Sequence, residues 1–299
     1  HVIEFEPGPS YYTTAGQGNP AVIKTNLFSE LTGFLLPGIG NHAYASWCDY
    51  DRDGDLDFLL SGYGISKIYR NEGADIFSDQ TGIILEGVSG GASAWGDYNN
   101  DGFPDILITG SNNSGIPVSI IYRNNGNNTF TEQTTISLHG VHGGSAVWGD
   151  YNNDSYPDIL LTGWDNVNHI SKIYRNNGDN TFSDQTAILP KGVHGGAAAW
   201  GDFDNDGFTD ILISGWSSSG YGTLVYRNNG DGTFAEQTGI DLPDVTNSTS
   251  SWGDFNNDGK LDIFLAGNGN GFNISSIYQN NLTAANSAPP APSGLSSAS

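Results

Sequence analysis

The chain is poor in positive charge and in long apolar stretches. Its 299 residues include 10 Lys and Arg against 33 Asp and Glu, giving a formal charge of −23. Nucleic-acid binding depends on basic surfaces, and anionic membranes repel an acidic protein, so neither is an expected partner. No apolar run reaches the roughly 20 residues that a transmembrane helix needs. We therefore also expect no insertion into a membrane.

Sulfur is almost absent, with one cysteine, Cys48, and no methionine. A single cysteine cannot form a disulfide within the chain, which leaves a buried inert thiol or a reactive, intermolecular one. There is no Met at position 1 and no signal-peptide pattern. We expect the chain to be a fragment or a processed form, and a missing leader then says little about its location.

What the chain has in abundance is a repeated acidic loop. A Trp-Gly-Asp motif, with Cys48 in place of Gly in the first copy, opens five copies about 48 to 53 residues apart, at Trp47, Trp95, Trp148, Trp200 and Trp252. A fixed period of this length indicates a repeat architecture. We number each loop from its first Asp as position 1.

Oxygen-bearing side chains recur at alternate positions of these loops. Positions 1, 5 and 9 are Asp in every copy: Asp49, Asp53 and Asp57; Asp97, Asp101 and Asp105; Asp150, Asp154 and Asp158; Asp202, Asp206 and Asp210; Asp254, Asp258 and Asp262. Position 3 is Asp51, Asn99, Asn152, Asp204 or Asn256, and position 7, which can offer its backbone carbonyl, is Asp55, Phe103, Tyr156, Phe208 or Lys260. Ca²⁺ takes six to eight oxygen ligands from loops of this kind. The pattern predicts up to five Ca²⁺ sites, and five such ions would change the formal charge from −23 to −13. A generally acidic, soluble surface is the alternative.

Position 6 of the loop is glycine in four copies and Ser155 in the third. A sharp turn there predicts a positive φ, which glycine adopts without steric cost. We expect the third loop to be strained or to bind metal more weakly.

The loops join strands, because position 9 is followed at once by short apolar runs such as Ile106-Leu107-Ile108. A complete repeat contains four predicted strands: one ending at Trp-Gly-Asp, one after the loop, one around Tyr-Arg, and one starting at a Phe after an Asn-Gly turn. We see no helical period. The pattern predicts an all-β chain, a β-propeller of four-stranded antiparallel blades. The recurring Trp and Phe side chains are predicted to pack between blades.

The two ends of the repeat region leave the number of blades open. The fifth copy stops after its third strand, and residues near Leu27 to Thr32 resemble a spare fourth strand. Pairing these ends would close a ring of five blades; the alternative is an arc of a larger ring. Residues 1–21 form an N-terminal segment or partial blade, 22–282 the propeller, and 283–299 a Pro-rich linker.

The Trp-Gly-Asp-Tyr-Asn-Asn-Asp-Gly loop, the Ile-Leu-x-Thr-Gly strand and the Tyr-Arg-Asn-Asn-Gly turn resemble FG-GAP or VCBS repeats of secreted and surface-exposed bacterial proteins. These are similar to the Ca²⁺-binding blades of integrin α-subunit propellers. The resemblance implies a non-catalytic module for adhesion or glycan binding, located outside the cell or on the bacterial surface and attached to further domains. The segment Ala288 to Leu295 resembles the opening of a fibronectin type III domain.

Three kinds of function stay open at this point. The first is recognition of a glycan or an extracellular protein, with Ca²⁺ mainly structural. Trp164 and Trp216 follow the second strands next to amide and hydroxyl residues, and His142 and His194 recur six residues before their Trp. These four are candidate ligand-binding residues, or else packed turn and linker residues. The second is a propeller domain of a secreted polysaccharide-degrading enzyme, but no catalytic motif is found. The third is a structural spacer.

Overall fold

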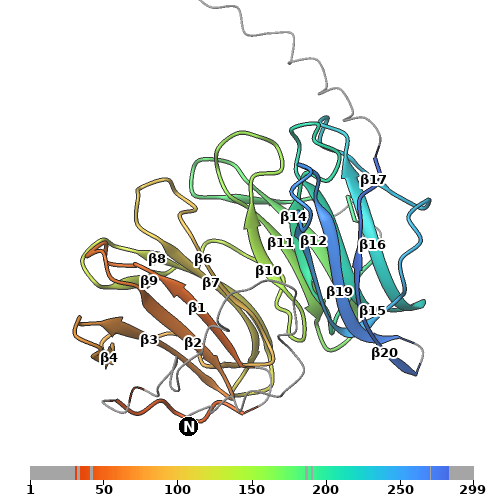
Figure 1. The fold of residues 1–299 in the computed structure, drawn as a ribbon. Coiled ribbons are helices and arrows are strands. Elements are labelled where there is room, and N and C mark those ends of the chain that lie inside the picture. The colour runs from red at the N-terminus through yellow and green to blue at the C-terminus, as the bar shows by residue number, and fades with distance from the viewer. Residues whose placement is uncertain are drawn as a thin grey trace, which may run out of the picture.

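The computed structural model describes residues 31, 34–40, 43–185, 188–189, 191–269 and 271–282. Within these residues the regular elements are twenty β-strands (Figure 1). No helix in this part of the chain is long and apolar enough to cross a membrane. The predicted N-terminal segment, Pro-rich linker and fibronectin-like start fall on residues outside the described ones.

Consecutive strands pair antiparallel and form five blades, which we name A to E. Blade A contains β1 (Tyr44–Cys48), β2 (Asp57–Gly62), β3 (Ile65–Asn71) and β4 (Phe77–Asp79). Blade B contains β6 (Ser93–Gly96), β7 (Asp105–Asn112), β8 (Pro117–Asn124) and β9 (Phe130–Glu132). Blade C contains β10 (Ala146–Gly149), β11 (Asp158–Trp164), β12 (His169–Asn176) and β13 (Phe182–Asp184).

Blade D contains β14 (Ala198–Gly201), β15 (Asp210–Ser217), β16 (Gly220–Asn228) and β17 (Phe234–Glu236). Blade E contains β18 (Thr246–Gly253), β19 (Asp262–Gly269) and β20 (Phe272–Tyr278). A short strand, β5 (Val88–Ser89), bridges β3 and β7 and so joins blades A and B in one sheet. The predicted four-stranded antiparallel blades of a β-propeller are confirmed.

The second strand of each blade forms its core. β7 contains Ile106, Leu107 and Ile108, each fully buried, because neighbouring blades cover both faces of the strand. A strand buried on both faces has a continuous apolar run rather than an alternating one. The first strands β1, β6, β10, β14 and β18 lie next to one another in series, so the blades are arranged radially.

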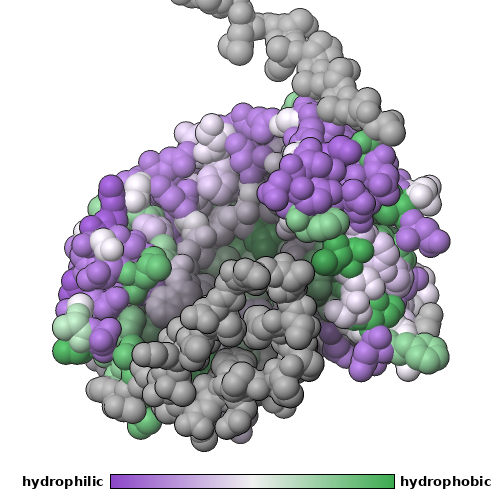
Figure 2. Space-filling view, in the orientation of Figure 1, coloured by the Kyte–Doolittle hydropathy of each residue, from purple (hydrophilic) through white to green (hydrophobic). Residues whose placement is uncertain are grey.

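The five blades form an arc, and their sheets do not close into a ring (Figure 1). The closed five-blade ring is therefore not observed. Blade E has three strands among the described residues, and of the segment Leu27 to Thr32 only Leu31 is described, as exposed non-strand chain. A cavity of about 470 Å³, lined by Phe203, Trp252 and Tyr278, lies where other blades pack their fourth-strand Phe. Hydrophobic side chains are exposed over β19 and β20, where Figure 2 shows green surface.

Tryptophan packing between blades is confirmed, and it explains the glycine that follows Trp in blades B, C and D. A Cβ on Gly149 would lie 2.5 Å from Cδ1 of Trp200 in the next blade, and one on Gly201 would lie 2.5 Å from Cδ1 of Trp252. Only a residue without a side chain allows this approach. At the open end of blade A, Trp47 is 60% exposed.

A second contact between blades uses the Asn that lies at the end of the third strand in blades B, C and D and two residues after it in blade E. The Asn124 side-chain amide donates to the carbonyl of Tyr50 in blade A, at 2.9 Å, and to Pro104 of its own loop. Asn176, Asn228 and Asn280 repeat the contact, with Tyr98, Tyr151 and Phe203 as inter-blade acceptors. Each of these amides therefore satisfies a main-chain acceptor of the preceding blade.

Candidate functional site

The five acidic loops, which we name A to E after the blades that contain them, have one geometry, held by backbone donors. In loop A the carboxylate of Asp49 accepts hydrogen bonds from the backbone N–H of Asp53 at 3.0 Å and of Gly54 at 3.1 Å. The same two bonds recur in every loop. The N–H of position 7 donates to the position 5 carboxylate in each copy. The loop is thus preformed around its side-chain oxygens.

The Asp at position 9 is buried and connects the loop to the third strand. Asp105 accepts the N–H of Tyr98 at 3.1 Å and the N–H of Asn124 at 2.7 Å. Burial raises the pKa of Asp105, Asp158 and Asp210 to about 7 and that of Asp57 to about 6. These carboxyl groups are costly to ionise without a nearby cation.

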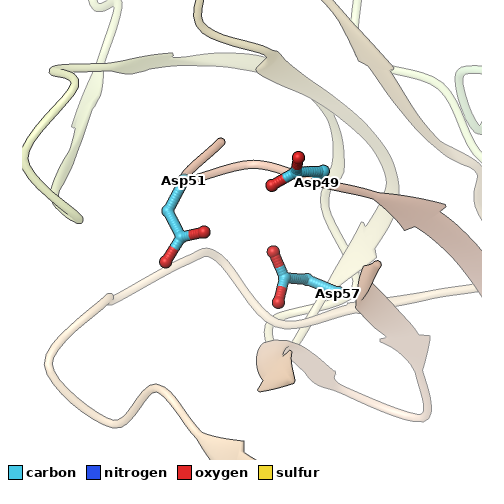
Figure 3. A group of neighbouring side chains, drawn as sticks. All are labelled: Asp49, Asp51 and Asp57. Carbon is cyan, nitrogen blue, oxygen red and sulfur yellow. The ribbon is translucent and has the colours of Figure 1, made fainter. Parts of the chain in front are cut away.

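In two loops the carboxylates converge closely enough to share a cation. Ligand atoms of Asp49, Asp51 and Asp57 lie within 4.8 Å of one another, and so do those of the corresponding Asp202, Asp204 and Asp210. Figure 3 shows the first three side chains pointing toward a common space. The side chain of Asp51 is 4% exposed, and its Oδ1 atom is buried without a hydrogen-bond partner among the described residues. Buried oxygens facing one point fit a hard cation such as Ca²⁺.

Sequence reasoning missed a partner of these carboxylates. The Arg of each Tyr-Arg-Asn segment in blades A to D forms ion pairs with its own loop, so these loops already contain one bound positive charge. The recurrence of Tyr-Arg was visible in the sequence, but only strand pairing brings the third strand beside the loop.

Position 4 of the loop was also missed, and it connects neighbouring loops. The side-chain amide of Asn100 donates to the carbonyl of Ser155 at 2.9 Å, and Asn153 and Asn205 reach Gly207 and Gly259 in the same way. In loop A the guanidinium of Arg52 lies 5.4 Å from the ring centre of Phe103. The acidic loops are therefore linked along one edge of the arc.

Position 6 has a positive φ in every loop, as predicted. The values are 95° at Gly54, 88° at Gly102, 89° at Gly207 and 83° at Gly259, and 70° at Ser155. Ser155 thus adopts a backbone conformation that L-residues other than Asn and Asp rarely adopt.

We expect Ser155→Gly to stabilise the protein by about 0.5 to 1 kcal/mol, because it removes strain at a left-handed position. Thermal melting measures the gain. The reciprocal change, Gly207→Ser, is the matched control and should destabilise by a similar amount, since its Cβ would meet no described atom within 4 Å. A loss of stability in Ser155→Gly would contradict the assignment of strain.

The opposite end of the blades contains the other four predicted site residues. Because β11 and β15 start at the acidic loops, their ends at Trp164 and Ser217 lie at the far edge. Trp164 and Trp216 belong to these strands rather than following them, which corrects the predicted boundary. His142 forms an isolated bridge with Trp164, and His194 forms one with Trp216.

Trp164 and His194 also meet across the seam between blades C and D. Their ring centres are 5.4 Å apart, and His169, which pairs with Trp164 in the hairpin, lies 4.7 Å from the Trp164 ring. Nδ1 of His169 is 2.9 Å from Nδ1 of His194. Burial, and then the neighbouring His169 and His142, lower the pKa of His194, so its ring is neutral at pH 7. Sequence reasoning missed His169, which has no counterpart of its type in the other repeats.

The tips of the hairpins beside Trp164, His169 and His194 combine aromatic and polar groups. Trp216 is 41% exposed and packs edge-on against Tyr221 at 4.9 Å. Asn166 is exposed, and its Oδ1 lies 3.0 Å from Nε2 of His142. The carboxylate of Asp165 accepts hydrogen bonds from two backbone N–H groups and lies 2.9 Å from Nε2 of His139. These contacts hold the hairpin of blade C in place. We call Trp164, His169, His194, Trp216, Tyr221 and Asn166 the aromatic–imidazole cluster.

Comparison with protein families agrees with this architecture. Residues 49–108, 97–161, 150–213 and 214–265 each match the model of the FG-GAP-like repeat. The chain belongs to the FG-GAP-like repeat family. The family matches start at or near the acidic loops in the first three repeats, so these FG-GAP-like units run from loop to loop across the blade boundaries.

Two further similarities concern whole proteins. Cartilage acidic protein 1 of Xenopus tropicalis is 25% identical over 256 residues, 76% of this chain and 39% of that protein. The chain thus spans about two fifths of the length of this relative. Among solved structures, the chain is similar to a lectin of Agrocybe aegerita that recognises non-reducing terminal N-acetylglucosamine. The TM-score is 0.52 and the sequence identity is 19%, and the match covers 80% of this chain and 66% of the lectin. That likeness concerns the fold alone.

Proposed function

We propose that this chain is a recognition module that binds a glycan through the aromatic–imidazole cluster, while its acidic loops bind Ca²⁺ for structural reasons. The observation that carries the proposal is the meeting of Trp164, His169 and His194 at the seam of blades C and D, beside the exposed Trp216. Fold similarity to a lectin supports it.

The chemistry of this surface suits a sugar. A sugar ring has apolar C–H faces that pack on an aromatic ring, and hydroxyl groups that need hydrogen-bond donors and acceptors beside it. Trp216 and Tyr221 offer the aromatic surface, and the Asn166 amide and the neutral imidazole of His194 offer the polar groups. Neutral rings cost less to desolvate than charged ones.

The acidic loops support binding of Ca²⁺ rather than catalysis. Their position 1 and position 9 carboxylates are held by backbone N–H groups, and the position 5 carboxylates of loops A to D pair with Arg. The position 9 carboxylates are buried, so a substrate cannot reach them, and those at positions 1 and 5 are already held by these partners, so none is well placed to act as a general acid. Free Ca²⁺ concentrations that suit such loops, with Kd of about 10⁻⁴ to 10⁻³ M, occur outside cells. The proposed location is therefore extracellular, in a protein with further domains.

A glycan array of the 299-residue protein in Ca²⁺ tests the proposal. The variant Trp216→Ala should weaken binding to the best ligand by about tenfold or more, as expected for a central aromatic contact. Tyr63→Ala is the matched control, because Tyr63 is a 73% exposed aromatic at the corresponding turn of blade A. It should leave binding unchanged.

Two results would contradict the proposal. One is equal binding by the wild type and Trp216→Ala. The other is the absence of any glycan ligand in Ca²⁺ for a protein whose melting curve shows it folded, which would favour a protein ligand or a spacer role.

A further inference from the structure

The third-strand arginines do not contact all loops equally. In loop A, Nε of Arg70 is 2.6 Å from Oδ2 of Asp51, and its terminal nitrogen is 2.9 Å from Oδ2 of Asp53. In loop D, Nε of Arg227 is 2.6 Å from Oδ2 of Asp204, and the same side chain pairs with Asp206. Each of these arginines therefore bridges positions 3 and 5 of its loop.

Loops B and C have a single contact instead. Arg123 lies 3.0 Å from Asp101, and Arg175 lies 3.4 Å from Asp154, both at position 5. Position 3 is Asn in these two loops and Asp in loops A and D. The number of arginine contacts thus follows the number of acidic groups at positions 3 and 5.

Loop E lacks the arginine altogether. Its ligand residues are of the same types as those of loop C, but the third strand of blade E continues into Gln279, which is exposed. The nearest cation recorded for the loop is Lys260, whose Nζ is 3.8 Å from Oδ2 of Asp258, beyond hydrogen-bond distance. Loops C and E therefore share the side-chain types at positions 1, 3, 5 and 9 and differ in this arginine, and also at position 6, Ser155 against Gly259, and at position 7, Tyr156 against Lys260.

We propose that the third-strand arginines act as internal counter-ions, which occupy position 3 and position 5 carboxylates in competition with Ca²⁺. Loops A to D are then partly neutralised without metal, and loop E has no third-strand arginine to do this. The inference rests on the calcium part of the proposed function. Its physical basis is that a guanidinium and a Ca²⁺ ion use the same carboxylate oxygens, and that two cations in one small loop repel each other.

If arginine instead supported metal binding, its removal would have the opposite effect on Ca²⁺ affinity. If the guanidinium only oriented the carboxylates for the metal, removing it would weaken Ca²⁺ binding. If it is a counter-ion, removing it strengthens Ca²⁺ binding and weakens only the metal-free loop. The two roles are therefore separated by the sign of the change in affinity.

The test uses two reciprocal variants of the 299-residue chain, Arg227→Gln and Gln279→Arg. Isothermal titration with CaCl₂ and melting curves in EDTA and in CaCl₂ are recorded for each. Arg227→Gln should lower the melting temperature in EDTA, recover most of that loss in Ca²⁺, and tighten one site by about tenfold. Gln279→Arg, at an exposed position, should raise the melting temperature in EDTA and weaken one site by a similar factor.

Several outcomes overturn the proposal. These are weaker Ca²⁺ binding in Arg227→Gln, or equal shifts of the melting temperature in EDTA and Ca²⁺ for both variants. If the wild type takes up no Ca²⁺, the calcium part of the proposed function fails. The counter-ion role is then decided by the EDTA curves alone, where it requires a loss for Arg227→Gln and a gain for Gln279→Arg.

Discussion

Removal of Ca²⁺ is expected to lower the melting temperature of the protein by about 10 °C or more. With Ca²⁺ at ten times its Kd, each occupied loop adds about 1.4 kcal/mol to the free energy of unfolding. At about 2 °C per kcal/mol for a chain of this size, five loops amount to about 14 °C. Differential scanning calorimetry in EDTA and in 10 mM CaCl₂, at pH 7.5, measures the difference.

The size of this effect should depend on pH. The pKa values of about 7 at Asp105, Asp158 and Asp210 lie above the usual value of 3.8. In the metal-free protein these carboxyl groups hold a proton more tightly when the chain is folded than when it is unfolded. Their contribution to the free energy of unfolding is therefore fully present below about pH 4 and is lost as the pH rises through 7. Ca²⁺ favours the ionised form, so its stabilisation should be larger at pH 7.5 than at pH 5.5.

A matched control is MgCl₂ at the same concentration. Mg²⁺ demands a smaller, octahedral site and gives up its water reluctantly, so it should restore little of the melting temperature. Identical melting curves in EDTA and CaCl₂ would show that the loops hold their geometry through backbone donors and arginine alone.

The second large effect is expected from a single methyl group between blades. Gly149→Ala places a Cβ 2.5 Å from Cδ1 and 2.7 Å from Nε1 of Trp200, so blades C and D must move apart. Overpacking of this kind costs about 1 to 3 kcal/mol or more, and chemical denaturation measures the loss.

Gly253→Ala is the matched control for this substitution. Gly253 follows the Trp of blade E, and no described atom lies within 4 Å of the place that its Cβ would occupy. Stability should change by less than about 0.5 kcal/mol. If both variants lose the same stability, the glycine serves the strand itself and not the contact between blades.

The features that could be predicted from sequence are those that repeat locally. The apolar run from Ile106 to Ile108 follows Asp105 directly, so a strand had to begin at the end of the loop. The turn at position 6 needed a positive φ, and the glycine found there in four of the five loops indicated it, with Ser155 as the exception in loop C. Both rest on contacts within a few residues.

What escaped prediction depends on contacts across strands and blades. Arg227 meets Asp206 only because the third strand lies beside the second, and Asn228 reaches Tyr151 only because blade C lies beside blade D. The register of the blade C hairpin places His169, and the segment before blade D places His194, so the two rings meet only when both blades are folded. No periodicity within one repeat specifies such a pairing. A closed ring of five blades, one of the two alternatives that the sequence left open, is not observed, and the segment Leu27 to Thr32 that would close it lies mostly outside the described residues.

The amide bridges from Asn124, Asn176, Asn228 and Asn280 end on main-chain oxygens of the preceding blade. The receiving residue is Tyr in three cases and Phe in the fourth, because its side chain takes no part in the bond. Blades A to D therefore each offer the next blade the same main-chain acceptor, whatever the side chain at that position. We therefore expect that a whole repeat can be exchanged, inserted or deleted without a change in the sequence of its neighbours.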